Sequence, residues 1–324
     1  MKKILRMYRA IVTAAALLTI LTACEYKELG DTYEIPVDSK RRITIHYDWS
    51  QVDSIPPSMR VVWYPNDASP YPRSYQLLDI LSRDTTVYVG MGSYDVVAWN
   101  NDAEHVLVPW KNMSQASTVL ATTAPYDAHG SKNIPKVLDS LYNGQTVLDY
   151  PDYMVHTVSQ SFTVENKPGD QVITLTPDSM VVTIHVNLKK IAGLEYCQRI
   201  RGALNNVAEK RYMAYDNKTD GVVSVIFDAY PNLADSCVTA TFWVFGVEPD
   251  YHKLMTFFWL EGGQLYLTID VTDRINEAMR NSRDIYIDID DLDINLADYI
   301  IKSGSGFVVD ADDWEDIENI AIDF

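Results

Sequence analysis

ITIHYDW, residues 43–49, is the stretch from which the fold class can be inferred. Its large apolar side chains, Ile43, Ile45, Tyr47 and Trp49, occupy alternate positions, and polar residues stand between them. Successive side chains of a β-strand point to opposite faces of the sheet, so this alternation predicts a strand with one buried face.

The same alternation recurs along most of the chain. It predicts further strands at 60–64, 85–89, 93–99, 157–164, 172–176, 181–188, 222–227, 238–247, 254–260, 265–271 and 285–289. Turn-forming Pro, Gly and Asn residues separate these strands. Short strands at this spacing indicate an all-β protein built from antiparallel sandwiches. Helix is sparse, and we expect short helices only at 272–281 and 134–141.

The turn Lys167-Pro168-Gly169-Asp170 separates two strand-rich halves. We therefore expect one β-sandwich over residues 41–168 and a second over residues 169–324. The stretch from Lys111 to Tyr150 carries only a weak pattern and is the main irregular region of the first half.

The N-terminus has the pattern of an export signal. Four Lys or Arg residues among the first nine precede an apolar run at 11–21, which is far shorter than the ~20 residues that a membrane-spanning helix needs. Leu21-Thr22-Ala23 leads directly into Cys24 and resembles the lipobox of bacterial lipoproteins. The resemblance implies that residues 1–23 are a removed signal peptide, that Cys24 is acylated, and that residues 24–40 form a polar tether. Acidic residues directly after Cys24 also resemble the signal of lipoproteins displayed on the outer face of Gram-negative outer membranes.

The formal net charge is −18. Binding to nucleic acid depends on basic patches that neutralise phosphates, so this charge argues against a nucleic-acid partner.

Apart from Cys24, the chain has two cysteines, Cys197 and Cys237. An exported protein stands in a compartment that permits disulfides, so these residues either form a disulfide or remain as two partly buried thiols. Neither a CxxC motif nor a Cys/His cluster indicates a metal site.

No arrangement of residues indicates catalysis. The six histidines are scattered, and the chain has neither a GxSxG nucleophile motif nor a phosphate-binding loop. The acids near Asp290 lack the glycine and the terminal glutamate of an EF-hand. Trp49, Trp99 and Trp259 share the apolar phase of their strands, which favours core packing over a sugar-stacking platform. We therefore expect no enzyme, no cofactor and no metal site.

Four segments carry a family resemblance: IHYDW at 45–49, RVVWYP at 60–65, GSYDVVAWNND at 92–102 and GFVVDADDW at 306–314. Together with the lipobox, they resemble an uncharacterised family of outer-membrane lipoproteins that is related to fimbrillins and to the anchor and assembly proteins of type V fimbriae. The resemblance implies two tandem transthyretin-like, Greek-key β-sandwiches. It also implies a structural or adhesive role at the cell surface, without catalytic residues.

Fimbrillins of this kind lose their first strand to an arginine-directed protease, and a neighbour's strand fills the groove by β-strand addition. Arg41 and Arg42 stand immediately before the first predicted strand, where such a cut would act, but they would equally end a solvated tether. Anchor-type relatives keep their lipid and are not cut, and we favour this alternative here. The C-terminal residues 314–324 are expected to be either a donor strand or the closing strand of the second sandwich.

These observations predict a surface-exposed outer-membrane lipoprotein that acts as a fimbrial anchor, assembly or minor adhesive subunit. The alternative is a glycan-binding surface lipoprotein. The expected partners are the outer membrane, through the lipid on Cys24, and fimbrial subunits or other surface proteins, through β-strand addition.

Overall fold

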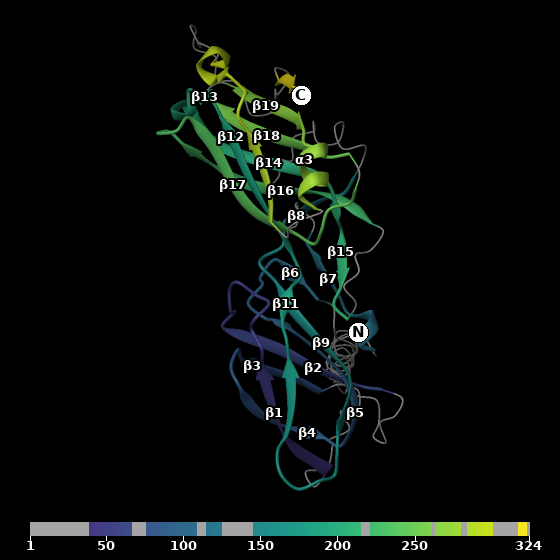
Figure 1. Ribbon diagram of the computed structural model, residues 1–324. Coiled ribbons are helices and arrows are strands. Elements are labelled where there is room, and N and C mark those ends of the chain that lie inside the picture. The colour runs from purple at the N-terminus through teal and green to yellow at the C-terminus, as the bar shows by residue number, and fades with distance from the viewer. Residues whose placement is uncertain are drawn as a thin grey trace, which may run out of the picture. The chain divides into compact units, whose positions relative to one another are not determined.

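The structure is a computed structural model that describes residues 39–66, 76–108, 115–124, 145–214, 221–249, 251–260, 263–279 and 284–300, and the backbone of residues 317–322 (Figure 1). The predicted signal peptide, the acylated Cys24 and the predicted helix at 134–141 lie outside the described residues. Residues 41–324 form one compact unit.

A three-stranded sheet contains the first strand. Its order is β10 (Gln171–Leu175), β1 (Lys40–Tyr47) and β4 (Thr85–Gly90). β1 is the central strand and runs parallel to β10, with Ile43 opposite Gln171 and Tyr47 opposite Leu175.

A five-stranded sheet packs against it to complete the first sandwich. Its order is β11 (Asp178–Ser179), β9 (Val155–Val164), β5 (Gly92–Asn100), β2 (Ser58–Pro65) and β3 (Gln76–Leu81). Alternate side chains of both sheets meet in one apolar core that includes Ile43, Ile45, Trp63, Val96 and Leu175. The strands form because their apolar residues recur with period two and so reach this core together.

A single nine-stranded sheet forms the second sandwich, and its two halves share one core. Its order is β20 (Asp284–Ile289), β12 (Val182–Lys189), β17 (Cys237–Val244), β16 (Val222–Asn232), β14 (Cys197–Ala208), β18 (Lys253–Leu260), β19 (Gly263–Asp270) and β22 (Ile317–Ile322), and β8 (Val147–Asp149) also pairs with β16. β16 joins the two halves of this sheet, because its first part pairs with β14 and its last three residues pair with β17. The apolar faces of both halves share one core, in which Phe227 and Phe242 stack with ring centroids 3.8 Å apart.

Smaller elements complete the chain. Two small sheets pair β6 (Val106–Leu107), β7 (Leu120–Thr123) and β15 (Lys210–Tyr212), and β13 (Ile191–Ala192) with β21 (Ile294–Asn295). The helical turns are η3 (Ala116–Thr118), η5 (Leu194–Tyr196), α3 (Thr272–Ala278) and η6 (Leu296–Tyr299). Among the described residues, no helix is both long enough and apolar enough to cross a membrane.

The predicted all-β sandwich class is confirmed. The predicted helix at 272–281 is confirmed as the shorter α3. Strand pairings span the predicted domain boundary. β8, before the boundary, pairs with β16, and β10, after the boundary, pairs with β1. The division at residues 168 and 169 stays a prediction.

Candidate functional site

The first strand is buried on one face and has a neighbouring strand on each side. Ile43 and Ile45 are fully buried and Tyr47 is 5% exposed. β10 and β4 flank β1 in the sheet, so the main chain of β1 has a partner strand along both edges. Loss of β1 would open a groove between β10 and β4.

Arg41 and Arg42 lie inside β1, which starts at Lys40, so the strand begins earlier than the sequence pattern indicates. Arg42 forms an ion pair with Asp170, with 3.3 Å between Nη2 and Oδ2. Arg41 donates a hydrogen bond to the side-chain oxygen of Asn166. Both arginines are thus held to the turn that precedes β10. Their role as a processing site stays a prediction.

The outer face of this sheet carries polar side chains together with two exposed apolar ones, Tyr88 of β4 and Val172 of β10. Thr44 and Thr86 share a hydrogen bond of 3.2 Å, and Nδ1 of His46 lies 2.9 Å from Oδ2 of Asp84. The hydrogen bond from His46 lowers the pKa of the Asp84 carboxyl. This face is therefore mixed, with hydrogen-bonded polar pairs beside exposed apolar side chains.

Cys197 and Cys237 are both free thiols in the structure. Cys197 begins β14 and Cys237 begins β17, and β16 lies between these strands in the sheet. Burial raises the pKa of the Cys197 thiol to about 11 and also raises the pKa of Cys237. A disulfide between them stays a prediction.

The C-terminal strand β22 pairs in parallel with β19, from Gln264 opposite Ile317 to Ile269 opposite Ile322. In this chain it therefore closes one edge of the second sandwich. This matches the closing-strand alternative for residues 314–324.

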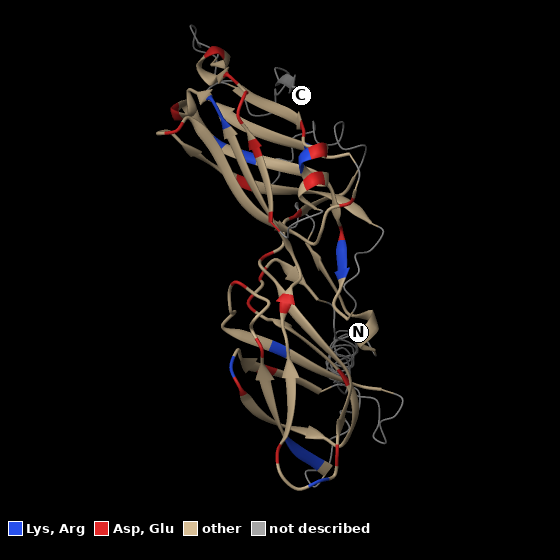
Figure 2. Cartoon of the chain, in the orientation of Figure 1, with Lys and Arg blue, Asp and Glu red and all other residues tan. Residues whose placement is uncertain are grey.

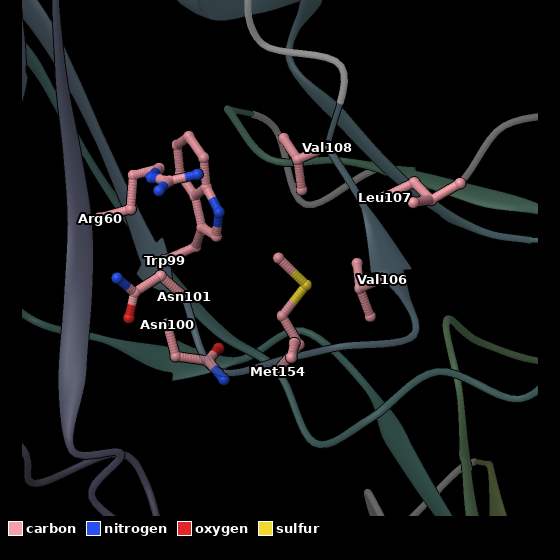
Figure 3. Close-up of a pocket in the computed structure, with 9 residues that line it drawn as sticks. Arg60, Trp99, Asn100, Asn101, Val106, Leu107, Val108 and Met154 are labelled. Atoms are coloured by element: carbon pink, nitrogen blue, oxygen red, sulfur yellow. The ribbon is translucent and has the colours of Figure 1, made fainter. Parts of the chain in front are cut away.

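A cavity of about 450 Å³ lies beside the five-stranded sheet (Figure 3). Arg60 of β2 and Trp99 of β5 are opposite residues in the sheet and form one side of the cavity together with Asn101. Val106 and Val108 stand across from them, with Met154 between the two sides (Figure 3). The cavity therefore has one side with polar groups and one aliphatic side.

Hydrogen bonds fix the polar side of the cavity. Arg60 donates from Nε and Nη2 to the two carboxylate oxygens of Asp79, both at 2.8 Å. This contact raises the pKa of Arg60 and lowers the pKa of Asp79. Ser58 donates to the side-chain oxygen of Asn101. The geometry of these groups is therefore set before any ligand arrives.

The aliphatic side is held by a neighbouring pair of hydrogen bonds between His105 and Asp152. The backbone N–H of His105 donates to Oδ2 of Asp152 at 2.7 Å, and Nδ1 of His105 lies 2.8 Å from Oδ1 of the same carboxylate. Asp152 raises the pKa of His105, chiefly through this hydrogen bond. Since His105 directly precedes Val106, the contact positions the aliphatic wall.

The sequence pattern did not identify this cavity. Trp99 was assigned correctly to the core, and it is only 3% exposed. Asn101 lies in the segment at 92–102 that carries the family resemblance, but nothing in the sequence assigned it to a cavity, and Met154 and Val106 carry no motif. Pairs of opposite charge such as Arg60 and Asp79 become visible only when the register of β2 and β3 is known.

Nothing in the described part of the chain indicates a metal centre, because no group of three or more His, Cys, Asp or Glu residues there is arranged to hold an ion. Acidic residues lie in turns, in strands and in α3, and basic residues lie mainly in strands such as β1 and β15 (Figure 2).

Three solved bacterial proteins show similarity to this chain. A "putative adhesin" from Bacteroides ovatus is 18% identical, with a TM-score of 0.58, over 78% of this chain and 91% of that chain. A "putative polysaccharide binding" protein from Bacteroides thetaiotaomicron is 11% identical, with a TM-score of 0.47, over 76% and 89% of the two chains. The fimbrial anchor protein Mfa2 from Porphyromonas gingivalis is 14% identical, with a TM-score of 0.42, over 67% and 77%.

The two lower TM-scores do not establish a common fold, so the assignment of the fold rests on the Bacteroides ovatus protein. At 18% identity this similarity establishes the fold and no more. The predicted resemblance to fimbrillin-related proteins is confirmed at that level.

No curated protein matches the chain. One family model matches residues 23–228, which is more than half of the chain, and its description is a domain of unknown function, DUF5119. The chain therefore belongs to the DUF5119 family.

Proposed function

We propose that this protein is a lipid-anchored protein of the outer membrane that serves as a fimbrial anchor or accessory subunit and keeps its first strand. The observation that carries the proposal is the position of β1 at the centre of its sheet, with Ile43 and Ile45 fully buried. The lipobox at Cys24 and the fold shared with the Bacteroides ovatus protein support it.

Energetics favour an uncut chain. Burial of a large apolar side chain contributes about 1.5 to 3 kcal/mol, and β1 places Ile43, Ile45 and Tyr47 in the core. Whole-domain stability is only about 5 to 15 kcal/mol, so removal of the strand would be tolerated only if another strand replaced it. An anchor that keeps β1 needs no such replacement.

Partners would join at sheet edges. β3 and β4 are edge strands of the two sheets of the first sandwich in the described part of the chain. An edge strand presents main-chain N–H and C=O groups that an incoming strand can pair with. This geometry supports assembly with fimbrial subunits or other surface proteins by β-strand addition.

The test is the mature N-terminus of the protein extracted from cell membranes. We expect an acylated Cys24 by mass spectrometry, and a Cys24→Ala variant should move from the detergent phase to the aqueous phase. A mature chain that starts at Arg42, Ile43 or Val61 would overturn the uncut anchor. Deletion of the protein should change the length or retention of fimbriae, and unchanged fimbriae would overturn the fimbrial role while leaving the lipid anchor standing.

A further inference from the structure

The imidazole of His252 lies between two main-chain carbonyl groups. His252 immediately precedes β18 and is fully buried. Its Nδ1 lies 3.1 Å from the carbonyl oxygen of Asn205, and its Nε2 lies 2.7 Å from the carbonyl oxygen of Glu248. Both distances are those of N–H···O hydrogen bonds. Each ring nitrogen therefore faces a group that can only accept a hydrogen bond.

A neutral imidazole satisfies only one of these two contacts. It carries a proton on one ring nitrogen and a lone pair on the other, whereas an imidazolium carries a proton on both. In the neutral ring, one lone pair would point at a carbonyl oxygen inside the protein, and a buried polar contact of this kind is costly. Both hydrogen bonds together require the doubly protonated ring.

The surroundings of His252 can accommodate a positive charge. Burial of a charge is costly unless hydrogen bonds compensate, and hydrogen bonds from a charged donor are the stronger ones. The neighbours of His252 in the chain and the segments bonded to it carry the titratable residues Glu248, Tyr251, Lys253, Asp270, Asp273 and Arg274. Lys253 lies over the ring of Tyr251, and Asp270 accepts from the N–H of Thr272. Three carboxylates thus stand against two cations, which leaves one negative charge for the imidazolium to balance.

His252 connects three segments of the second sandwich. Asn205 belongs to the bulge of β14, and Glu248 lies in the connection from β17 to β18. The N–H of His252 donates to Oγ1 of Thr272 at 2.9 Å, and its carbonyl accepts from the N–H of Val271 at 3.0 Å. One residue therefore holds the bulge, the connection and the start of α3 together.

We propose that His252 is a pH-sensitive clasp. With a proton on both ring nitrogens, it bonds the bulge of β14 at Asn205 and the β17–β18 connection at Glu248. When one proton is lost, the other stays on Nε2, which makes the shorter contact, and the lone pair of Nδ1 repels the carbonyl of Asn205. The clasp therefore opens at the bulge as the pH rises through the range of about 5 to 8 in which histidine changes its charge. It depends neither on the lipid anchor nor on fimbrial assembly.

The test is NMR of the histidine ring nitrogens in a ¹⁵N-labelled chain that starts after Cys24, since protonated and unprotonated ring nitrogens give well-separated signals. The loss of one set of signals in His252→Gln assigns the ring. We expect both nitrogens to be protonated at about pH 5.5 and only Nε2 at about pH 8.5, with a matching shift of the backbone amide signals around Asn205. A ring that is neutral at the lower pH, a ring that stays doubly protonated at the higher pH, or amide signals around Asn205 that do not follow the ring would each overturn the clasp.

Stability measurements with a matched control provide the second test. Gln keeps one N–H donor for Glu248 but carries no charge, so it resembles the ring after the loss of one proton. His252→Gln should therefore lower the urea midpoint clearly at about pH 5.5 and much less at about pH 8.5.

His185 is the control, because its Nδ1 lies 3.2 Å from the hydroxyl of Thr241, which can donate or accept. A neutral ring satisfies that contact, so His185→Gln should shift the midpoint by the same amount at both pH values. Equal shifts for His252→Gln at the two pH values would contradict the proposal, and if this variant does not fold, the ring signals of the wild-type chain decide.

Discussion

Arg42 in the first strand and Asp170 in the turn before β10 form an ion pair, with 3.3 Å between Nη2 and Oδ2. The pair joins the start of β1 to the start of the strand that runs parallel to it. Both side chains are about half exposed, and exposed pairs contribute at most about 1 kcal/mol. The core residues of β1, rather than this ion pair, should therefore hold the strand in place.

Truncation of a core residue in β1 tests this statement. Ile45 is fully buried, so Ile45→Ala should lower the free energy of unfolding by about 2 to 5 kcal/mol, since it removes apolar contacts and leaves a cavity. Thr44→Ala, on the polar face of the same strand, should change it by less than about 1 kcal/mol. Urea denaturation of both variants measures the difference, and equal midpoints would contradict the assignment of faces.

Proteolysis at Arg41 and Arg42 should depend on opening of β1. Trypsin needs an unpaired segment, so cleavage there tracks the population in which the strand is open. Asp170→Ala should speed this cleavage by no more than about fivefold, whereas Ile45→Ala should speed it by about 30-fold or more. Peptide mapping over time gives the rates. Rapid cleavage of the wild-type chain at these arginines would show that β1 is not protected by its sheet.

The contact between His105 and Asp152 should make stability depend on pH. The pKa of His105 is raised in the folded protein above its ordinary value of about 6.5. The stabilisation is therefore fully present below about pH 6.5 and is lost as the pH rises through the raised pKa. Because His105 is 47% exposed, the effect should stay below about 1 kcal/mol.

Asp152→Asn measures this effect. It should destabilise the protein more at about pH 5.5 than at about pH 8.5, and an NMR titration of His105 should show its pKa falling towards the ordinary value in the variant. His46→Asn, which changes a histidine remote in sequence, is the comparison variant for the His105 titration. A His105 titration that Asp152→Asn leaves unchanged would contradict the contact.

Thiol counting tests the cysteines. A chain that starts after Cys24 should show two thiols with Ellman's reagent when it is denatured without reductant, because Cys197 and Cys237 are free. The folded chain should react slowly at pH 8, since a pKa of about 11 leaves Cys197 almost entirely protonated. A count of zero in the denatured chain would instead establish the disulfide.

Removal of the C-terminal strand should expose an edge. A chain truncated after Ile300 lacks β22, so the edge of β19 loses its partner. Exposed edges pair with other chains, and we expect faster amide exchange in residues 263–270 together with self-association in light scattering. Deletion of residues 323 and 324 alone, which lie outside β22, should have neither effect. If the long truncation exchanges like the intact chain, β22 does not protect that edge.

Alternation along the sequence was sufficient to find β1, because only one face of that strand is buried. It failed for β14, the 12-residue strand Cys197–Ala208, where seven of the last eight positions run as a nearly continuous buried stretch. A strand covered on both faces shows no period of two. Glycine and asparagine are also uncommon inside strands, yet a Cβ at Gly202 would lie 2.1 Å from the ring of Phe227, so glycine is required there for close packing.

The sequence by itself determined the all-β class and which residues of β1 are buried, because these depend on local periodicity. Tertiary structure alone decided that β1 lies beside β10 and that Arg60, which lines a cavity, meets Asp79. Main-chain hydrogen bonds are alike for every residue, so alternation fixes the face of a strand and not its neighbour. A cavity depends on several such neighbours at once, and for that reason no pattern in the sequence marks its residues as members of one site.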